Sequence, residues 1–308
     1  MYSAQMYELG SKRSVIREIF EFGKKRAAEV GPENVFDFSL GNPSVPAPES
    51  VKKAIEELVL EGDPVMLHGY TSAPGDYGVR KAIADNINER YNAGVVPELM
   101  YMTAGAAAAL CSTIRALSCP GDEIIAFVPF FPEYTVFVNN NGGKLVSVGV
   151  REGDFQIDLA KLDAAMNEHT KAIIVNSPNN PSGVVYTKES IEALTDFMRK
   201  KAAEYGHPIY LIADEPYREL VYDDIEVPYL PNYYDNTVVC YSYSKSLSLP
   251  GERIGYALVS PKMEDAAGVY AAICGAGRSL GYVCAPSMFQ FVAGKCVGQT
   301  ADISIYKY

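Results

Sequence analysis

Short apolar segments alternate with turns and helical stretches over most of this chain, and this alternation restricts the fold more than any other feature. The apolar segments predict strands at 100–103, 123–128, 144–148, 172–176, 209–213, 237–242 and 254–260. Strands that alternate with helices form a mostly parallel sheet whose two faces are covered. Only residues 244–251 link the last two strands, so one strand is expected to be antiparallel. The predicted fold class is therefore α/β, with a three-layer α/β/α large domain.

Outside this region the sequence predicts helices and one further strand. We expect an amphipathic helix at 14–30, an alternating strand at 35–40, and helices at 49–60 and 77–91. Helical spacing at 263–269 and 287–306 is not followed by another strand. We therefore predict a large cofactor-binding domain at 45–261. Residues 1–44 and 262–308 are expected to form an N-terminal arm and part of a small α/β domain that is incomplete at its C-terminus.

Charge and composition argue against several classes of function. The 308 residues carry a formal net charge of −11, so no basic excess is present for binding nucleic acid. No run of about 18 apolar residues occurs and the first residues do not resemble a leader sequence, which predicts a cytoplasmic protein without a membrane span. Six cysteines form no C-x-x-C pair and the three histidines are far apart, so neither a disulfide framework nor a metal site is expected.

In open α/β sheets ligands bind beyond the carboxyl ends of the strands, so the residues that follow each strand are candidates for function. Gly105, Ala106 and Ala107 form a small-residue turn that opens a helix, where backbone N–H groups can approach a phosphate. A helix start rich in alanine for its helix propensity explains them equally well. After the next strand, Phe131 either stacks on a flat cofactor or packs in the core, and core packing is the commoner outcome.

Two polar stretches follow later strands. Residues 176–183 contain two prolines, three asparagines and a glycine, and a turn this rigid and polar favours a function for Asn180. The strand at 209–213 leads into Asp214, whose carboxylate is costly to bury unless it meets a cation such as a protonated ring nitrogen. Tyr217 brings a phenol to the same place. The alternative role for Asp214 is to cap the following turn.

One lysine lies among hydroxyl groups after the strand at 237–242. Burial at a strand end beside other cations lowers the pKa of an amine, which would make Lys245 nucleophilic. Ser242, Ser244 and Arg253 supply hydroxyl groups and a guanidinium suited to a phosphate dianion. Taken alone, this segment is explained equally well by a solvated lysine between two strands.

Together the strand ends supply a phosphate cradle, a stacking ring, an amide, a carboxylate, a phenol and a lysine. Pyridoxal 5'-phosphate needs this set, because it presents an aldehyde, a pyridine nitrogen, a ring oxygen and a phosphate. No single residue is specific for that cofactor. The ordered set is specific, and it predicts pyridoxal 5'-phosphate as the cofactor.

From about residue 14 to residue 300 the chain resembles the class I and II aminotransferases, the fold type I pyridoxal-phosphate enzymes related to aspartate aminotransferase. The matching motifs are Ser242-x-Ser244-Lys245 with Arg253, Asn180-Pro-Ser-Gly183, and Asp214-x-x-Tyr217. The resemblance implies that Lys245 is the Schiff-base lysine and that Asp214 is the partner of the pyridinium nitrogen. It also implies that Asn180 and Tyr217 bind the ring oxygen.

The resemblance extends to the remaining cofactor contacts and to a partner subunit. The phosphate would be held by Ser242, Ser244, Arg253 and the backbone around Gly105, Ala106 and Ala107, with Phe131 as the stacking ring. Tyr70 resembles the tyrosine that reaches the phosphate of the neighbouring subunit's site, which implies a homodimer with the site at the subunit interface. Gly41 matches the glycine near the substrate carboxylate, where Asn180 is also expected.

The implied activity is amino transfer between an L-amino acid and a 2-oxo acid by a ping-pong mechanism through Lys245. The family normally continues into a small domain with an arginine that clamps the substrate carboxylate, and we expect this chain to be a fragment that ends before it. A carbon–sulfur β-lyase of the same fold is the first alternative, because it shares the cofactor residues. A non-catalytic regulator is less favoured, since nothing basic precedes residue 14. The sequence does not specify the amino donor.

Overall fold

The computed structural model describes residues 2–11, 15–39 and 41–306, and the chain divides into two compact units, Met1–Ser44 and Val45–Tyr308. The first unit contains helices α1 (Ala4–Ser11) and α2 (Val15–Val30) and the short 3-10 helix η1 (Pro32–Asn34). Helix α2 confirms the predicted helix at 14–30, except for Ser14, which lies outside the described residues. The domain boundaries proposed from the sequence remain a prediction.

The predicted strand at 35–40 is wrong over residues 35–39, which have no regular secondary structure. A strand needs a neighbouring strand for its backbone hydrogen bonds, and within the described part of the chain no strand pairs with this segment. Phe36 and Phe38 are largely exposed, so the alternating apolar residues do not mark a buried face here. Leu40 lies outside the described residues.

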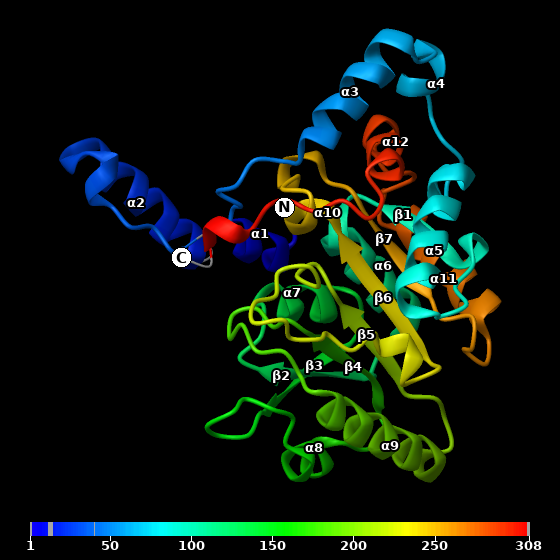
Figure 1. Cartoon of the computed structure of the whole chain (residues 1–308). Coiled ribbons are helices and arrows are strands. Elements are labelled where there is room, and N and C mark those ends of the chain that lie inside the picture. Colours follow the sequence, from blue (N-terminus) through cyan, green and yellow to red (C-terminus); the bar gives the residue numbers. More distant parts are fainter. Residues whose placement is uncertain (1, 12–14, 40, 307–308) are drawn as a thin grey trace. The chain divides into compact units, whose positions relative to one another are not determined.

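The second unit is built on a seven-stranded sheet (Figure 1). In spatial order the strands are β1 (Met100–Thr103), β7 (Gly255–Val259), β6 (Thr237–Ser242), β5 (Tyr210–Asp214), β4 (Thr170–Asn176), β2 (Glu123–Val128) and β3 (Lys144–Gly149). All seven predicted strands are confirmed, and their ends shift by two residues at most. Strand β7 is antiparallel to β1 and β6, whereas the other pairs are parallel, which confirms the prediction of one antiparallel strand.

Helices cover both faces of this sheet, which confirms the three-layer architecture. Successive strand residues point to opposite faces, so that Leu211 and Ala213 of β5 belong to one hydrophobic core and Ile212 to the other. The first core, here called the α5 face, is completed by α3 (Glu49–Glu61), α5 (Tyr77–Tyr91), α8 (Leu159–Ala165), α9 (Lys188–Tyr205) and α12 (Ser287–Lys295). The second, the α6 face, is completed by α6 (Gly105–Leu117), α7 (Glu133–Asn140) and α11 (Ala266–Ser279).

Two predicted helices near the C-terminus have different bounds in the structure. The helix predicted at 263–269 begins only at Ala266, where Asp265 accepts a hydrogen bond from the N–H of Gly268, and it continues as α11. The helix predicted at 287–306 is wrong beyond Lys295, because the chain leaves the helix there and Gly298 adopts a left-handed φ of +78°. Irregular chain then leads to η5 (Ser304–Tyr306).

The remaining short elements are α4 (Pro64–His68), α10 (Tyr243–Ser246), η2 (Pro97–Leu99), η3 (Leu230–Asn232) and η4 (Pro250–Glu252). The α10 turn follows β6 directly and carries Lys245. Among the residues that the structure describes, no helix is both long and apolar enough to cross a membrane.

The start of β7 packs closely against the start of α6. A Cβ atom on Gly255 would overlap with the carbonyl oxygen of Tyr241 and would lie 3.1 Å from the backbone of Gly105. Gly255 pairs with Ser242 on one side and with Thr103 on the other, so it lies between the strand ends that lead into α10 and α6. This close approach requires glycine at position 255.

The substitution Gly255→Ala should therefore lower the free energy of unfolding by about 1–3 kcal/mol, because the added methyl group has no space. Urea unfolding measures the effect. Gly251→Ala is the matched control, since a Cβ atom there meets nothing within 4 Å; its effect should stay below about 0.5 kcal/mol. Equal stabilities of the two variants would contradict the close packing.

Candidate functional site

Most of the predicted site residues converge on one cavity at the carboxyl ends of the strands. Strands β1, β4, β5 and β6 all end at this edge of the sheet, and the antiparallel strand β7 begins there. The cavity has a volume of about 180 Å³, and its lining includes Ala106, Ala107, Phe131, Asn180, Asp214, Tyr217, Ser242, Ser244, Lys245 and Arg253. Segments that are more than 100 residues apart in the sequence thus supply one site.

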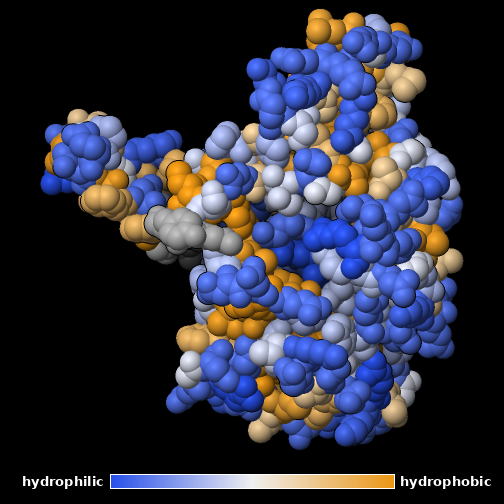
Figure 2. All heavy atoms as spheres, viewed as in Figure 1, coloured by the Kyte–Doolittle hydropathy of each residue, from blue (hydrophilic) through white to orange (hydrophobic). Residues whose placement is uncertain are grey.

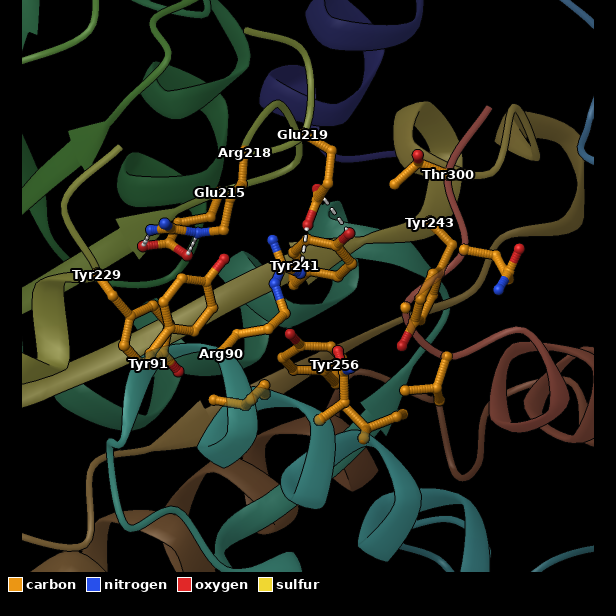
Figure 3. A pocket seen from close by; sticks show the side chains of 16 residues that line it. Arg90, Tyr91, Glu215, Arg218, Glu219, Tyr229, Tyr241, Tyr243, Tyr256 and Thr300 are labelled. Carbon is orange, nitrogen blue, oxygen red and sulfur yellow. Dashed lines mark hydrogen bonds and ion pairs between the residues drawn. The ribbon is translucent and has the colours of Figure 1, made fainter. Parts of the chain in front are cut away.

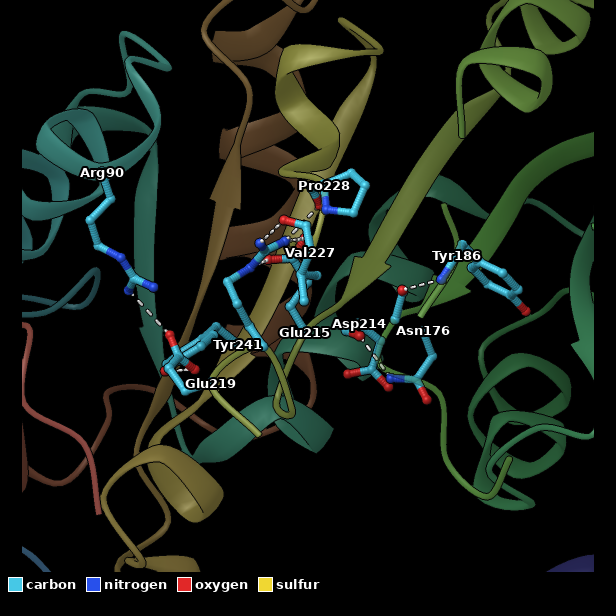
Figure 4. Close-up of polar contacts among 11 residues, drawn as sticks. Arg90, Asn176, Tyr186, Asp214, Glu215, Glu219, Val227, Pro228 and Tyr241 are labelled. Atoms are coloured by element: carbon cyan, nitrogen blue, oxygen red, sulfur yellow. Dashed lines mark hydrogen bonds and ion pairs between the residues drawn. The ribbon is translucent and has the colours of Figure 1, made fainter. Parts of the chain in front are cut away.

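Asp214 is the buried acid of this cavity. The hydroxyl of Tyr134 donates a hydrogen bond to its Oδ2 atom, and Asn176 Nδ2 donates to its backbone oxygen at 2.8 Å (Figure 4). Its other carboxylate oxygen, Oδ1, is buried and has no hydrogen-bond partner among the described residues. The pKa of Asp214 is raised to about 7, chiefly by burial; the hydrogen bond from Tyr134 opposes the rise, and the charge of Glu215 adds to it. A cationic N–H group placed at Oδ1 would satisfy this carboxylate.

Asn180 and Tyr217 form a hydrogen-bonded pair beside Asp214. Asn180 Nδ2 donates to the hydroxyl oxygen of Tyr217 at 2.9 Å, and the Asn180 N–H donates to Asn176 Oδ1 at 2.7 Å. Burial and the charge of Asp214 raise the pKa of Tyr217 to about 12, which keeps its hydroxyl protonated at neutral pH. The pair therefore presents an amide and a neutral phenol, two groups that can hydrogen-bond a ligand oxygen.

Lys245 lies in the single helical turn α10. Ser242 caps this turn by accepting a hydrogen bond from the Ser244 N–H at 3.2 Å, and the two serine hydroxyls are 2.6 Å apart. Burial lowers the pKa of the half-buried Lys245 amine, and the charge of Arg253 lowers it further, whereas Tyr306 opposes the shift. The environment therefore favours the neutral, nucleophilic amine more than an exposed surface would.

Arg253 and the first turn of α6 form a cationic cradle on the same side of the cavity. Arg253 Nη1 donates to the carbonyl oxygen of Pro250 at 2.9 Å, which orients the guanidinium. Gly105 has a left-handed φ of +80°, and a Cβ atom there would lie 2.9 Å from Arg253 Nη2. The first N–H groups of a helix have no hydrogen-bond partner within it, so those around Ala106 and Ala107 add partial positive charge near the Arg253 guanidinium. This arrangement suits an anion such as a phosphate.

The cavity lining also includes an aromatic ring. Phe131 is half-buried and lines the cavity, with its ring edge-on to Tyr134 at a centroid distance of 5.7 Å and an interplanar angle of 86°. Leu110, Pro216 and Pro250 add apolar surface to the lining. A flat ligand in this cavity would therefore have an aromatic face to stack on.

Three predicted residues, Gly105, Tyr70 and Gly41, are not among the lining residues of the cavity, although Gly105 lies next to Ala106 and against Arg253. Tyr70 is 94% exposed, and Gly41 belongs to the other unit, Met1–Ser44, so the roles expected for both stay predictions. The sequence reasoning missed Tyr134 as the partner of Asp214. Its position three residues after Phe131 was an available signal, because residues at this spacing share one side of a helical turn. Within the described ranges, no three His, Cys, Asp or Glu side chains are grouped so as to hold a metal ion.

Comparison with known proteins identifies the family of this chain. The model of the family "Aminotransferase class I and II" matches residues 33–283. The chain is 34% identical over 237 residues to aspartate aminotransferase from Thermotoga maritima and 32% identical over 286 residues to the putative aminotransferase YugH from Bacillus subtilis. These matches cover 76% and 92% of this chain and 60% and 68% of the relatives.

Solved structures give the same result. A crystal structure of an amino transferase from Eubacterium rectale matches with a TM-score of 0.97 and 57% identity, over 100% of this chain and 77% of that chain. Aspartate aminotransferase from Thermotoga maritima matches with a TM-score of 0.82 and 30% identity, over 96% and 74% of the two chains. The chain spans about three fifths of the length of the curated Thermotoga relative. The chain belongs to the class I and II aminotransferase family, whose members use pyridoxal 5'-phosphate.

Proposed function

We propose that this chain forms the cofactor-binding part of a pyridoxal-phosphate-dependent aminotransferase, which moves an amino group between an L-amino acid and a 2-oxo acid in a ping-pong reaction. The observation that carries the proposal is that one cavity contains both the half-buried side chain of Lys245 and the buried carboxylate of Asp214. The Oδ1 atom of that carboxylate has no hydrogen-bond partner among the described residues. Curated relatives carry the name aspartate aminotransferase, so aspartate is the first donor to test.

The side chains of the cavity fit this cofactor. A protonated pyridine nitrogen is the cationic donor that Asp214 Oδ1 lacks. Asn180 and Tyr217 offer an amide and a phenol to the ring oxygen. The guanidinium of Arg253 and the first N–H groups of α6 would bind the phosphate, and Gly105 has no side chain to fill the space between them. The observed groups thus match each polar part of the cofactor.

Each residue then has a separate task. Pyridoxal phosphate, when bound, supplies an aldehyde that combines with amines and a ring that takes up electrons. Lys245 Nζ binds the cofactor and moves a proton at the Cα atom of the substrate as a general base. Asp214 keeps a proton on the ring nitrogen, and its buried position strengthens that interaction. Phe131 and Arg253 orient the ring and the phosphate.

A homodimer with the site at the subunit interface is part of the same proposal. Large apolar side chains are exposed together along α3, α4 and the segment after them, namely Val59, Leu60, Val65, Met66 and Tyr70. Figure 2 shows apolar residues among charged ones at the end of the second unit where α3 and α4 lie. A second copy of the chain is the occupant that fits, because Tyr70 in this surface resembles the residue that reaches a neighbouring subunit's site.

The cytoplasmic location predicted from the sequence is also kept as a proposal. All six cysteines are free thiols in the structure, and Cys240 and Cys296 are buried. Reduced thiols at this frequency are usual in proteins of a reducing compartment. This observation supports the proposal without identifying the compartment directly.

The first prediction concerns Lys245. Purified protein mixed with pyridoxal phosphate should develop a visible absorbance band that changes when aspartate or another amino acid is added, and 2-oxoglutarate should restore the band. Lys245→Ala should abolish the band, because Lys245 supplies the amine among the described residues that line the cavity. Lys262→Ala replaces an exposed lysine and should keep it. An unchanged band in Lys245→Ala would overturn the assignment, and release of ammonia from the amino acid would indicate elimination in place of transfer.

The second prediction concerns the stability of the cofactor-free protein. The folded-state pKa of Asp214 is about 7 and its ordinary value is 3.8, so between these pH values the folded protein holds a proton that the unfolded chain has lost. Stability therefore falls as pH rises through this window, and the full cost is present above about pH 7. Asp214→Asn removes this cost and should raise the free energy of unfolding by up to about 4 kcal/mol at pH 8 and by little near pH 4.

Urea unfolding at several pH values measures this gain. The control is Asp235→Asn, which changes an exposed aspartate and should give no comparable stabilisation. The same Asp214→Asn protein should bind pyridoxal phosphate more weakly than the unchanged protein at pH 8, because the ring nitrogen loses its anionic partner. A gain in stability that does not depend on pH would contradict the assigned burial cost.

The third prediction concerns the dimer. Met66→Glu places a carboxylate in the exposed apolar surface, and burying it in an interface would cost several kcal/mol, so the dimer should weaken by roughly a hundredfold or more. Light scattering coupled to gel filtration gives the oligomeric state. Lys200→Glu on α9 is exposed and lies outside this surface, and it should leave the dimer intact. A monomeric unchanged protein at micromolar concentration would remove this part of the proposal.

A further inference from the structure

A chain of polar contacts runs behind the α10 turn, on the α5 face of the sheet (Figure 3). Arg90 Nη1 donates to Glu219 Oε1 at 3.2 Å, and the hydroxyl of Tyr241 lies 2.9 Å from Glu219 Oε2. Ser246 Oγ lies 2.8 Å from the Tyr241 hydroxyl. We call these four residues, Arg90, Glu219, Tyr241 and Ser246, the relay. It does not overlap with the lining of the cofactor cavity.

Each hydrogen bond of the relay has a defined donor and acceptor. Burial raises the pKa of Tyr241 well above its ordinary value, so its phenol keeps its single proton. A carboxylate only accepts, so Tyr241 donates to Glu219 and accepts from the hydroxyl of Ser246. The relay therefore runs from Ser246 through Tyr241 to Glu219. Arg90 supplies the opposite charge at Glu219 (Figure 4).

Two members of the relay, Ser246 and Glu219, belong to the segments that carry Lys245 and Tyr217. Ser246 follows Lys245 directly in the α10 turn, and Glu219 is two residues after Tyr217. A helix of four residues has too few internal hydrogen bonds to hold its own position. The backbone oxygen of Ser246 also accepts from the Ala301 N–H at 2.6 Å. The turn is thus held from outside by its side-chain and backbone contacts.

The surroundings of Tyr241 keep the middle of the relay rigid. Its ring stacks on Tyr256 with a centroid distance of 5.0 Å and meets Tyr243 edge-on at 5.2 Å. Arg90, Glu219 and Tyr241 line a small cavity of about 40 Å³ together with these rings. Nearby, Arg218 is committed to Glu215 through hydrogen bonds of 2.7 and 2.6 Å, so Arg90 is the cation that contacts Glu219. Side chains locked by packing are the kind that hold a reactive group in place.

We infer that Glu219, Tyr241 and Ser246 are positioning residues, which fix the α10 turn against the segment of Tyr217 and so set the place of the Lys245 amine in the cavity. Glu219 and Tyr241 act through Ser246 and do not touch the cofactor. This inference rests on the proposed function for what Lys245 does, but the positioning itself concerns the cofactor-free protein. Loss of the link would let the turn move and become more solvated.

The test compares Ser246→Ala and Tyr241→Phe with Tyr256→Phe. Ser246→Ala removes one oxygen and cuts the link to α10, while Tyr241 keeps its bond to Glu219. Tyr241→Phe keeps the stacked ring and removes the hydroxyl. Tyr256→Phe is the matched control, because it removes a hydroxyl from the ring stacked on Tyr241 without changing the relay.

The first readout needs no cofactor. The rate at which an amine reagent labels Lys245, followed by mass spectrometry as a function of pH, reports the pKa of this amine. In the unchanged protein burial lowers that pKa, with Arg253 acting in the same direction, Tyr306 opposing, and Asp214 and Tyr217 lining the same cavity. None of these four groups changes in the variants. Ser246→Ala and Tyr241→Phe should both move the midpoint to higher pH, and Tyr256→Phe should not.

The second readout is the affinity for pyridoxal phosphate. Each relay variant should bind it about tenfold more weakly, and the double variant should be no weaker than either single one, because both remove the same link. The inference is overturned if both relay variants follow Tyr256→Phe in labelling and in affinity, or if their effects simply add. A missing absorbance band in the unchanged protein would overturn the proposed function and would leave the labelling result to decide the positioning role.

Discussion

The burial of the Asp214 carboxylate is the constraint on which the site depends. It lies at the end of β5, the middle strand of the seven, where apolar layers cover both faces of the sheet. Burial in such a place raises the pKa of the carboxyl group and lowers the stability of the folded protein at neutral pH. A phenol from Tyr134 compensates for only one of its two oxygens. Unfavourable burial of this kind is retained at functional sites, where a bound ligand supplies the missing partner.

The direction of β7 brings the cationic groups of the cavity together. Because β7 is antiparallel to β6, its first residues lie at the edge of the sheet where β6 ends, so Arg253 returns to the cavity only eight residues after Lys245. The same strand pairs with β1, and Gly255 lies opposite Thr103 at the point where α6 begins. A parallel β7 would begin at the opposite edge and leave the start of α6 without its guanidinium. One reversed strand thus assembles the cradle.

Most of the sheet and the strand-end chemistry could be predicted, because apolar runs between turn residues are local signals. The failures have a different origin. Residues 35–39 alternate like a strand but have no neighbouring strand among the described residues, and the helix predicted at 287–306 ends at Lys295, shortly before the left-handed Gly298. Arg90 and Glu219 are 129 residues apart, and no local sequence pattern predicts their contact. Contacts of that kind depend on the completed packing.

The neighbouring acids Asp214 and Glu215 show how the structure separates stability from function. Successive residues point to opposite faces, so Asp214 meets Tyr134 on the α6 face, whereas Glu215 points toward the α5 face and pairs with Arg218 through two hydrogen bonds. Both carboxylates are buried, and Glu215 forms an ion pair with Arg218, whereas Asp214 Oδ1 has no hydrogen-bond partner among the described residues. If packing alone had determined both positions, each acid would need a permanent counter-ion, because an unpaired buried charge is costly. The difference between the two faces is best explained by a cation that arrives at Asp214 from outside the chain, and a protonated cofactor nitrogen meets that requirement.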